Sequence, residues 1–213
     1  MTRIATRLPS RRLAVAWLYL GGYSLFAVIY AFLPARSHAG ITGWSSTNLV
    51  NLRHDPAGSL VTSAFVPGDL AVTWVLLGAL GLFTVNRLLG NLRTAVLVVT
   101  GHVAGTLVSE GVVGYQVSHA ILPQSARTLV DVGPSYVVVC ALVAATLYGS
   151  WWERAAAGAG FAVLSFHIFR GLGHLDVTAT GHLVAAATGA LLGGLLLRST
   201  RAAAVFRGAA AGG

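Results

Sequence analysis

The chain has 213 residues, of which 55% are hydrophobic and only 9% are charged, and its formal net charge is +8. Soluble domains carry about 25% charged residues, so this composition excludes an ordinary soluble protein and indicates one that lies in a membrane. The 14 basic residues are all arginines, and they lie between apolar stretches instead of forming one basic face, which argues against nucleic acid as a partner. The single cysteine, Cys140, excludes a disulfide framework and a cysteine-based metal site.

The first apolar stretch, residues 13–33, follows a basic segment at 1–12 and is long enough to cross a bilayer. A cleavable signal peptide is the alternative, because Ser37-His38-Ala39 has the small-x-small form of a cleavage site. The apolar region of a signal peptide runs over about 7–15 residues, which is shorter than this stretch. We therefore expect a retained membrane helix, followed by a polar loop at 34–68 that lies on the membrane interface.

Five more apolar stretches follow, at residues 70–89, 95–113, 134–149, 155–169 and 177–197. The stretch 134–149 would rise only about 24 Å against a hydrocarbon core of about 30 Å, so its helix starts below the membrane surface. The pattern predicts an all-α polytopic membrane protein with a basic N-terminal segment (1–12), a six-helix membrane domain (13–197) and a basic Ala/Gly-rich tail (198–213) that frays. No internal repeat of the kind found in many transporters is evident.

The arginines predict the orientation of these six helices, because cytoplasmic segments carry an excess of basic residues. With the N-terminus inside, ten arginines face the cytoplasm: Arg3, Arg7, Arg11, Arg12, Arg87, Arg93, Arg154, Arg198, Arg201 and Arg207. Four face outside: Arg36, Arg53, Arg127 and Arg170. We therefore expect a multi-pass protein of the plasma membrane, surrounded by lipid, with both termini cytoplasmic.

Two reactive side chains are expected at the same depth in the outer half of the membrane. Ser135 lies in the first turn of the helix at 134–149, and His182 lies near the start of the helix at 177–197. A rise of 1.5 Å per residue puts them within about 3 Å of one level. A serine needs a neighbouring base to act as a nucleophile, and ionisable residues inside a membrane are functional by default. The pair is a candidate nucleophile and base.

The residues around this pair suit the same chemistry. Gly133 and Pro134 start a helix, and the unpaired N–H groups of its first turn, near Ser135 and Tyr136, can stabilise an oxyanion. On the second helix, the small residues Ala186, Gly189 and Gly193 share the face of His182, which predicts close packing between the two helices.

These motifs resemble those of rhomboid intramembrane serine proteases, and more closely the divergent rhomboid-like membrane proteins of actinobacteria. Rhomboids carry a Gly-x-Ser-Gly motif on the fourth of six helices, where this chain has Gly133-Pro134-Ser135-Tyr136. Their sixth helix carries a histidine followed by small residues, here His182, Ala185, Gly189 and Gly193. The segment Leu60–Phe65 is similar to the one that precedes the second helix of rhomboids. The resemblance covers about residues 13–197.

The resemblance implies a six-helix rhomboid-like bundle and a protease that cleaves transmembrane segments of partner proteins through a Ser-His dyad, without a cofactor. Two residues and one segment depart from the family pattern. Tyr136 replaces the glycine after the nucleophile, Val139 replaces the aromatic residue that stacks on the histidine, and residues 69–74 lack the His-x-x-x-Asn pair that binds the oxyanion. Losing one oxyanion donor costs about 10²–10³ in rate, so these departures predict slow cleavage.

Two alternatives remain open from the sequence. The first is a catalytically weak or inactive rhomboid relative that binds membrane-protein partners. The second is a metal-dependent membrane hydrolase that uses His182 with other polar residues of the membrane domain: His102, Glu110, His167, His174 and Asp176. These residues lack a tight i,i+4 pair and spread over three helices, so we predict no metal site.

Overall fold

The computed structural model describes residues 13–68 and 70–211, with side chains described up to residue 200. The predicted N-terminal segment at 1–12 and the side chains of Arg201 and Arg207 lie outside the described residues. Within them the fold is a bundle of α-helices without strands, which confirms the predicted all-α class.

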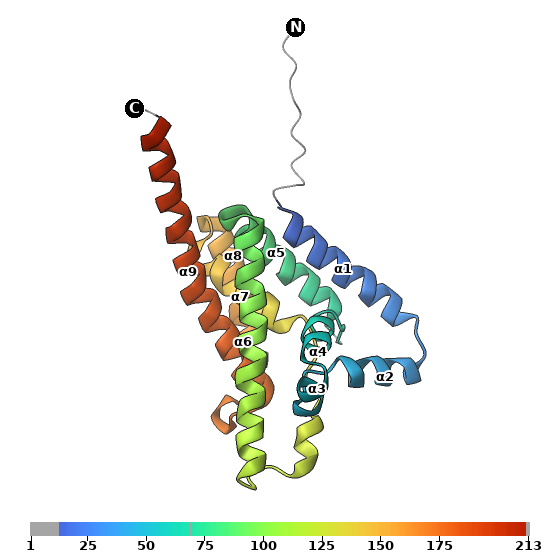
Figure 1. Ribbon diagram of the computed structural model, residues 1–213. Helices are drawn as coiled ribbons and strands as arrows, with labels where there is room; N and C mark the ends of the chain where they lie inside the picture. Colours follow the sequence, from blue (N-terminus) through green and yellow to red (C-terminus); the bar gives the residue numbers. More distant parts are fainter. Residues whose placement is uncertain (1–12, 69, 212–213) are drawn as a thin grey trace.

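Six long helices form the bundle: α1 (Ala14–Ala31), α5 (Ala71–Leu89), α6 (Asn91–Ser118), α7 (Ser135–Tyr148), α8 (Trp151–Ile168) and α9 (Val177–Ala211). By length and composition α1, α5, α6 and the Val177–Thr200 part of α9 are suited to cross a membrane, whereas α7 is apolar but shorter. The start of α1 and the end of α9 lie at the same end of the bundle, which we call the terminal end (Figure 1).

The opposite end of the bundle, the loop end, carries the connections (Figure 1). The segment expected as a polar loop at 34–68 contains three helices that the sequence analysis did not predict: α2 (Ala35–Ser45), α3 (Leu49–His54) and α4 (Pro56–Ser63). Asn48 caps α3, and Asp55 caps α4 ahead of a proline at its first turn, as these residue types favour. The short 3₁₀ helices η2 (Gln124–Thr128) and η3 (Leu172–His174) complete this end.

The short helix α7 lies at the centre of the bundle. Nine of its fourteen residues are buried, and glycines on three neighbouring helices let their backbones approach it. A Cβ atom would lie 2.9 Å from Leu142 N at Gly81 on α5, 2.6 Å from Cys140 Sγ at Gly101 on α6, and 2.3 Å from Cys140 O at Gly189 on α9. The contact at Gly189 confirms that the small-residue face of the last helix packs against α7.

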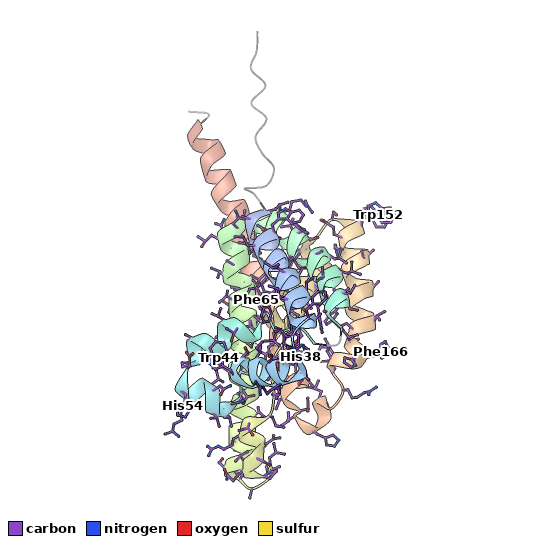
Figure 2. The ribbon with its side chains drawn as sticks, turned by 90° about the vertical axis from the view of Figure 1, so that its right-hand side faces the viewer. His38, Trp44, His54, Phe65, Trp152 and Phe166 are labelled. Carbon is purple, nitrogen blue, oxygen red and sulfur yellow. The ribbon has the colours of Figure 1, made fainter. Side chains whose placement is uncertain are left out.

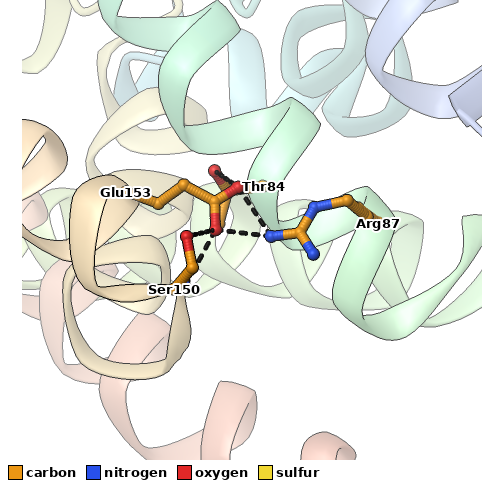
Figure 3. Close-up of polar contacts among 4 residues, drawn as sticks. All are labelled: Thr84, Arg87, Ser150 and Glu153. Carbon is orange, nitrogen blue, oxygen red and sulfur yellow. Dashed lines mark hydrogen bonds and ion pairs between the residues drawn. The ribbon is translucent and has the colours of Figure 1, made fainter.

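Two helix boundaries differ from the sequence prediction. Helix α8 begins at Trp151, ahead of the expected Ala155, because Ser150 and Glu153 form a capping box there. Glu153 also accepts hydrogen bonds from Thr84 Oγ1 (3.1 Å) and pairs with Arg87, so the start of α8 is tied to the end of α5 (Figure 3). Helix α9 continues to Ala211, beyond the expected end of the last apolar stretch at Leu197.

The surface of the bundle suits a lipid environment. Leu18 on α1 is 75% exposed, and Phe166 on α8 is 84% exposed. Trp152 lies at the terminal end and Trp44 at the loop end (Figure 2), and both are exposed. Tryptophans are enriched at the two membrane–water interfaces, so their separation fits a bundle that spans the bilayer from end to end.

Candidate functional site

Ser135 is the first residue of α7, at the loop end of this helix. Gly133 adopts φ +129°, a conformation that favours glycine, and its N–H donates to Ser63 O of α4 at 2.8 Å. The first hydrogen bond of the helix runs from Val138 N–H to Pro134 O (2.9 Å). The N–H groups of Ser135 and Tyr136 precede that bond and have no partner within the helix.

His182 lies in the second turn of α9 and is only 2% exposed. Neither of its ring nitrogens has a hydrogen-bond partner among the described residues, so Ser135 does not donate to it. The imidazole instead packs edge-on against the ring of Tyr136, with 5.0 Å between the ring centroids and 76° between the planes. The fold thus brings the starts of α7 and α9 together, and the residue that contacts His182 directly is Tyr136.

Two glycines make room for the Tyr136 side chain. A Cβ atom at Gly181, beside His182 on α9, would lie 2.2 Å from Tyr136 Oη. A Cβ atom at Gly105 on α6 would lie 3.0 Å from Gly181 O and 3.3 Å from the Tyr136 ring. A larger residue at Gly181 would collide with the phenol, and one at Gly105 would be tight against the ring and Gly181 O, so the phenol occupies a slot between α6 and α9.

Asp131 belongs to this site, although the sequence motifs did not single it out. Its Oδ2 accepts a hydrogen bond from Tyr136 Oη at 3.2 Å. Burial raises the pKa of Asp131 to about 6, and the hydrogen bonds from Tyr136 and Thr47 oppose that rise. The available sequence signal was an acidic residue next to an apolar helix in a chain with only six acidic residues.

Further polar groups of α6 face the same region. Glu110 is 2% exposed, and its Oε1 has no hydrogen-bond partner among the described residues. Thr106 on α6 and Thr180 on α9 also bury hydroxyl groups without a partner in this part of the structure. The site is therefore a buried polar cluster inside an apolar bundle.

The other polar residues considered from the sequence are dispersed. His102 Nε2 lies 2.9 Å from Leu60 O and 3.3 Å from Ser63 Oγ, so it links α6 to α4. His167 and His174 are exposed at the ends of α8 and η3. Asp176 caps α9 by accepting from Thr178 N at 3.1 Å. No three histidine, cysteine or carboxylate side chains in the described residues are placed to hold a metal ion.

An apolar cavity of about 240 Å³ lies next to the cluster, between α1, α4, α6 and α7. His102 and Val137 are among its lining residues, together with Tyr19 and Phe65. A second apolar cavity, of about 350 Å³, lies on the other side of Phe65 and reaches Trp44 on α2. Figure 2 shows Phe65 and Trp44 in this part of the molecule. Both cavities suit apolar chains such as those of lipids or membrane helices.

Comparison with known proteins agrees with this architecture. The family model described as "Rhomboid-like protein" matches residues 11–202, which include Ser135, Tyr136 and His182. No curated protein and no solved structure matches the chain.

Proposed function

Because the chain belongs to the family of rhomboid-like proteins, we propose that this multi-pass membrane protein is an intramembrane serine protease that acts through Ser135 and His182. One observation carries the proposal. A buried imidazole with two unpartnered nitrogens lies at the start of α9, where α9 packs against the first turn of α7 that carries Ser135. A buried imidazole without hydrogen bonds costs free energy. Ionisable residues inside membrane proteins therefore usually have a functional role.

In the proposed reaction, Ser135 Oγ attacks the carbonyl carbon of a peptide bond and its proton passes to His182. The N–H groups of Ser135 and Tyr136 stabilise the negative oxygen of the tetrahedral intermediate. His182 then gives the proton to the leaving amine, and water releases the acyl group from Ser135. Catalytic hydrogen bonds are often longer in a free enzyme than in its substrate complex, so the dyad forms when substrate draws the two helix starts together.

The proposed substrate is a transmembrane segment that unwinds near the loop end of the bundle. The arginine distribution supports a loop end outside the cell and cytoplasmic termini in a plasma membrane. The 1–12 and 198–213 segments would then flank the 13–197 membrane domain on the cytoplasmic side. Helix α7 is short and begins well short of the end of α6 (Figure 1), and we propose that water and a locally unwound peptide meet at its first turn.

The second candidate is a rhomboid relative that binds membrane proteins without cleaving them. The observation that favours it is the position of Tyr136, whose ring contacts His182 while Ser135 does not. The start of α5 also offers neither a histidine nor an asparagine to bind an oxyanion, so the backbone N–H groups would act without help. A binder needs only the packed bundle and its apolar cavities.

Cleavage of single-span reporter proteins separates the two candidates. The protein is reconstituted in liposomes with reporters whose transmembrane segments carry Gly or Pro near the outer end. We expect slow cleavage by the wild type, and none by Ser135→Ala or His182→Ala. A chelator should leave the rate unchanged, which separates the dyad from a metal hydrolase. Reporters that co-purify equally with wild type and Ser135→Ala but stay intact would favour the binder.

A further inference from the structure

The segment before α7 is bound to the connection between α2 and α3 through Asp131. Thr47 N–H donates to Asp131 O at 2.9 Å, and Thr47 Oγ1 donates to the same oxygen at 3.0 Å. In return, Asp131 N–H donates to Ser46 Oγ at 3.0 Å. Asp131, Thr47 and Ser46 are all buried. These three hydrogen bonds fix the backbone of Asp131 independently of its side-chain contacts.

The side chain of Asp131 then fixes the phenol of Tyr136. Its Oδ2 accepts from Tyr136 Oη at 3.2 Å and from Thr47 Oγ1 at 3.3 Å. Tyr136 is 2% exposed and fills the slot that Gly105 and Gly181 leave open. A buried hydroxyl without a partner is costly, and this hydrogen bond, with Ser109 on α6 also near the hydroxyl, helps to fix how deep the ring lies in the slot.

No hydrogen bond of normal geometry holds the imidazole of His182 among the described residues. The backbone groups of Ile168 and Thr178 lie near its ring, and packing determines the rest of its orientation. The Tyr136 ring, 5.0 Å away and nearly perpendicular, is its aromatic neighbour. A displacement of about 1 Å at a catalytic group can cost about 10²-fold in rate, so the position of this ring matters for any chemistry at His182.

We propose that Asp131 is a positioning residue for His182, acting through Tyr136 and coupling the imidazole to the connection between α2 and α3. As far as it concerns catalysis, this inference rests on the proposed Ser135–His182 dyad. Asp131 touches neither Ser135 nor His182. A ligand or substrate that moves Thr47 at the loop end would move Asp131 with it, and hence the ring against which His182 packs.

The test compares four single variants and one double variant, Asp131→Ala with Tyr136→Phe, of the full-length protein in detergent. Asp131→Ala and Tyr136→Phe each remove the Asp131–Tyr136 hydrogen bond, whereas Asp131→Asn keeps an acceptor oxygen of the same shape. Tyr148→Phe is the matched control, because Tyr148 Oη donates to Ala190 O at the far end of α7. It removes an α7–α9 hydrogen bond far from the site.

The first readout is the rate of covalent labelling of Ser135 by a fluorophosphonate. Asp131→Ala and Tyr136→Phe should each lower kinact by about tenfold with KI unchanged, and the double variant should be no slower than either single one. Asp131→Asn and Tyr148→Phe should stay within about twofold of the wild type. An Asp131→Asn variant as slow as Asp131→Ala would overturn the inference.

The second readout does not depend on activity. Protein labelled with ¹³C,¹⁵N-histidine gives a ring signal for His182, assigned by its loss in His182→Gln. That signal should shift in Asp131→Ala and return to its wild-type position in Asp131→Asn. If the wild type is never labelled by the probe, the dyad fails, but a shifted His182 signal still supports positioning by Asp131. An unchanged signal in Asp131→Ala would overturn the inference whatever the labelling result.

Discussion

The imidazole of His182 packs edge-on against Tyr136, the residue that directly follows Ser135, at a centroid distance of 5.0 Å. This contact joins the first turn of α7 to the second turn of α9, and no hydrogen bond links the candidate base to Ser135 among the described residues.

The close approach of α9 to α7 predicts opposite effects for two glycine substitutions. Gly189→Ala should lower the thermal midpoint in detergent, because its Cβ would lie 2.3 Å from Cys140 O, and overpacking costs about 1–3 kcal/mol. Gly111→Ala on α6 is the matched control. A Cβ there meets nothing within 4 Å, and alanine gains up to about 1 kcal/mol of helix propensity over glycine. Equal midpoints for the two variants would contradict the α7–α9 packing.

The buried carboxylate Asp131 predicts a pH dependence of stability. Its pKa rises from 3.8 to about 6 on folding, so the folded protein binds this proton more tightly than the unfolded protein does. The free energy of unfolding should therefore fall as pH rises from about 4 to about 6, by at most about 3 kcal/mol. Asp131→Asn should lack this component. Parallel pH curves for the wild type and Asp131→Asn would show that Asp131 is not buried as described.

The cluster at the start of α8 predicts a local stabilising role for Glu153. Glu153 accepts from Ser150 N at 2.8 Å and from Ser150 Oγ at 2.6 Å, and it pairs with Arg87. Glu153→Ala should lower stability by about 1–2 kcal/mol through loss of the capping box. Arg87→Ala should cost less than about 1 kcal/mol, because an exposed ion pair contributes little. Chemical unfolding in detergent measures both, and a larger loss for Arg87→Ala would reverse this assignment.

The orientation can be tested with single introduced cysteines, since the native Cys140 is fully buried. One cysteine replaces Arg127, which lies in η2 at the loop end. The other replaces Leu92, which lies at the start of α6 and is 78% exposed. In intact cells, a membrane-impermeant maleimide should label Arg127→Cys, and it should label Leu92→Cys only after the membrane is opened. The reverse pattern would place the loop end in the cytoplasm.

Much of the fold was predictable because long apolar stretches in a membrane have few alternatives to helices. Helix α7 begins and ends within one residue of its predicted bounds, since Pro134 and Gly149 flank it. The helices of the first loop were missed, although Asn48 and the Asp55-Pro56 pair are readable start signals. The Ser150-x-x-Glu153 capping box was also visible in the sequence.

The side-chain arrangement of the site was harder to predict. Spacing along two helices indicated that Ser135 and His182 share a level, but it says nothing of rotation about each helix axis. Tyr136 was noted as a departure from a family motif, and its contact with His182 depends on the glycines of two other helices. The Asp131–Tyr136 hydrogen bond depends in turn on Thr47, 84 residues away in the chain.

Covalent labelling of Ser135 tests the central claim most directly. Purified wild-type protein is treated with a fluorophosphonate over many hours, and the modified residue is identified by intact mass and peptide mapping. The account predicts one adduct, on Ser135, that disappears in Ser135→Ala, forms much more slowly in His182→Ala and is unaffected by a chelator. An adduct that persists in Ser135→Ala on another residue, such as Ser109 or Ser165, or no adduct in a wild type that remains folded, would contradict it.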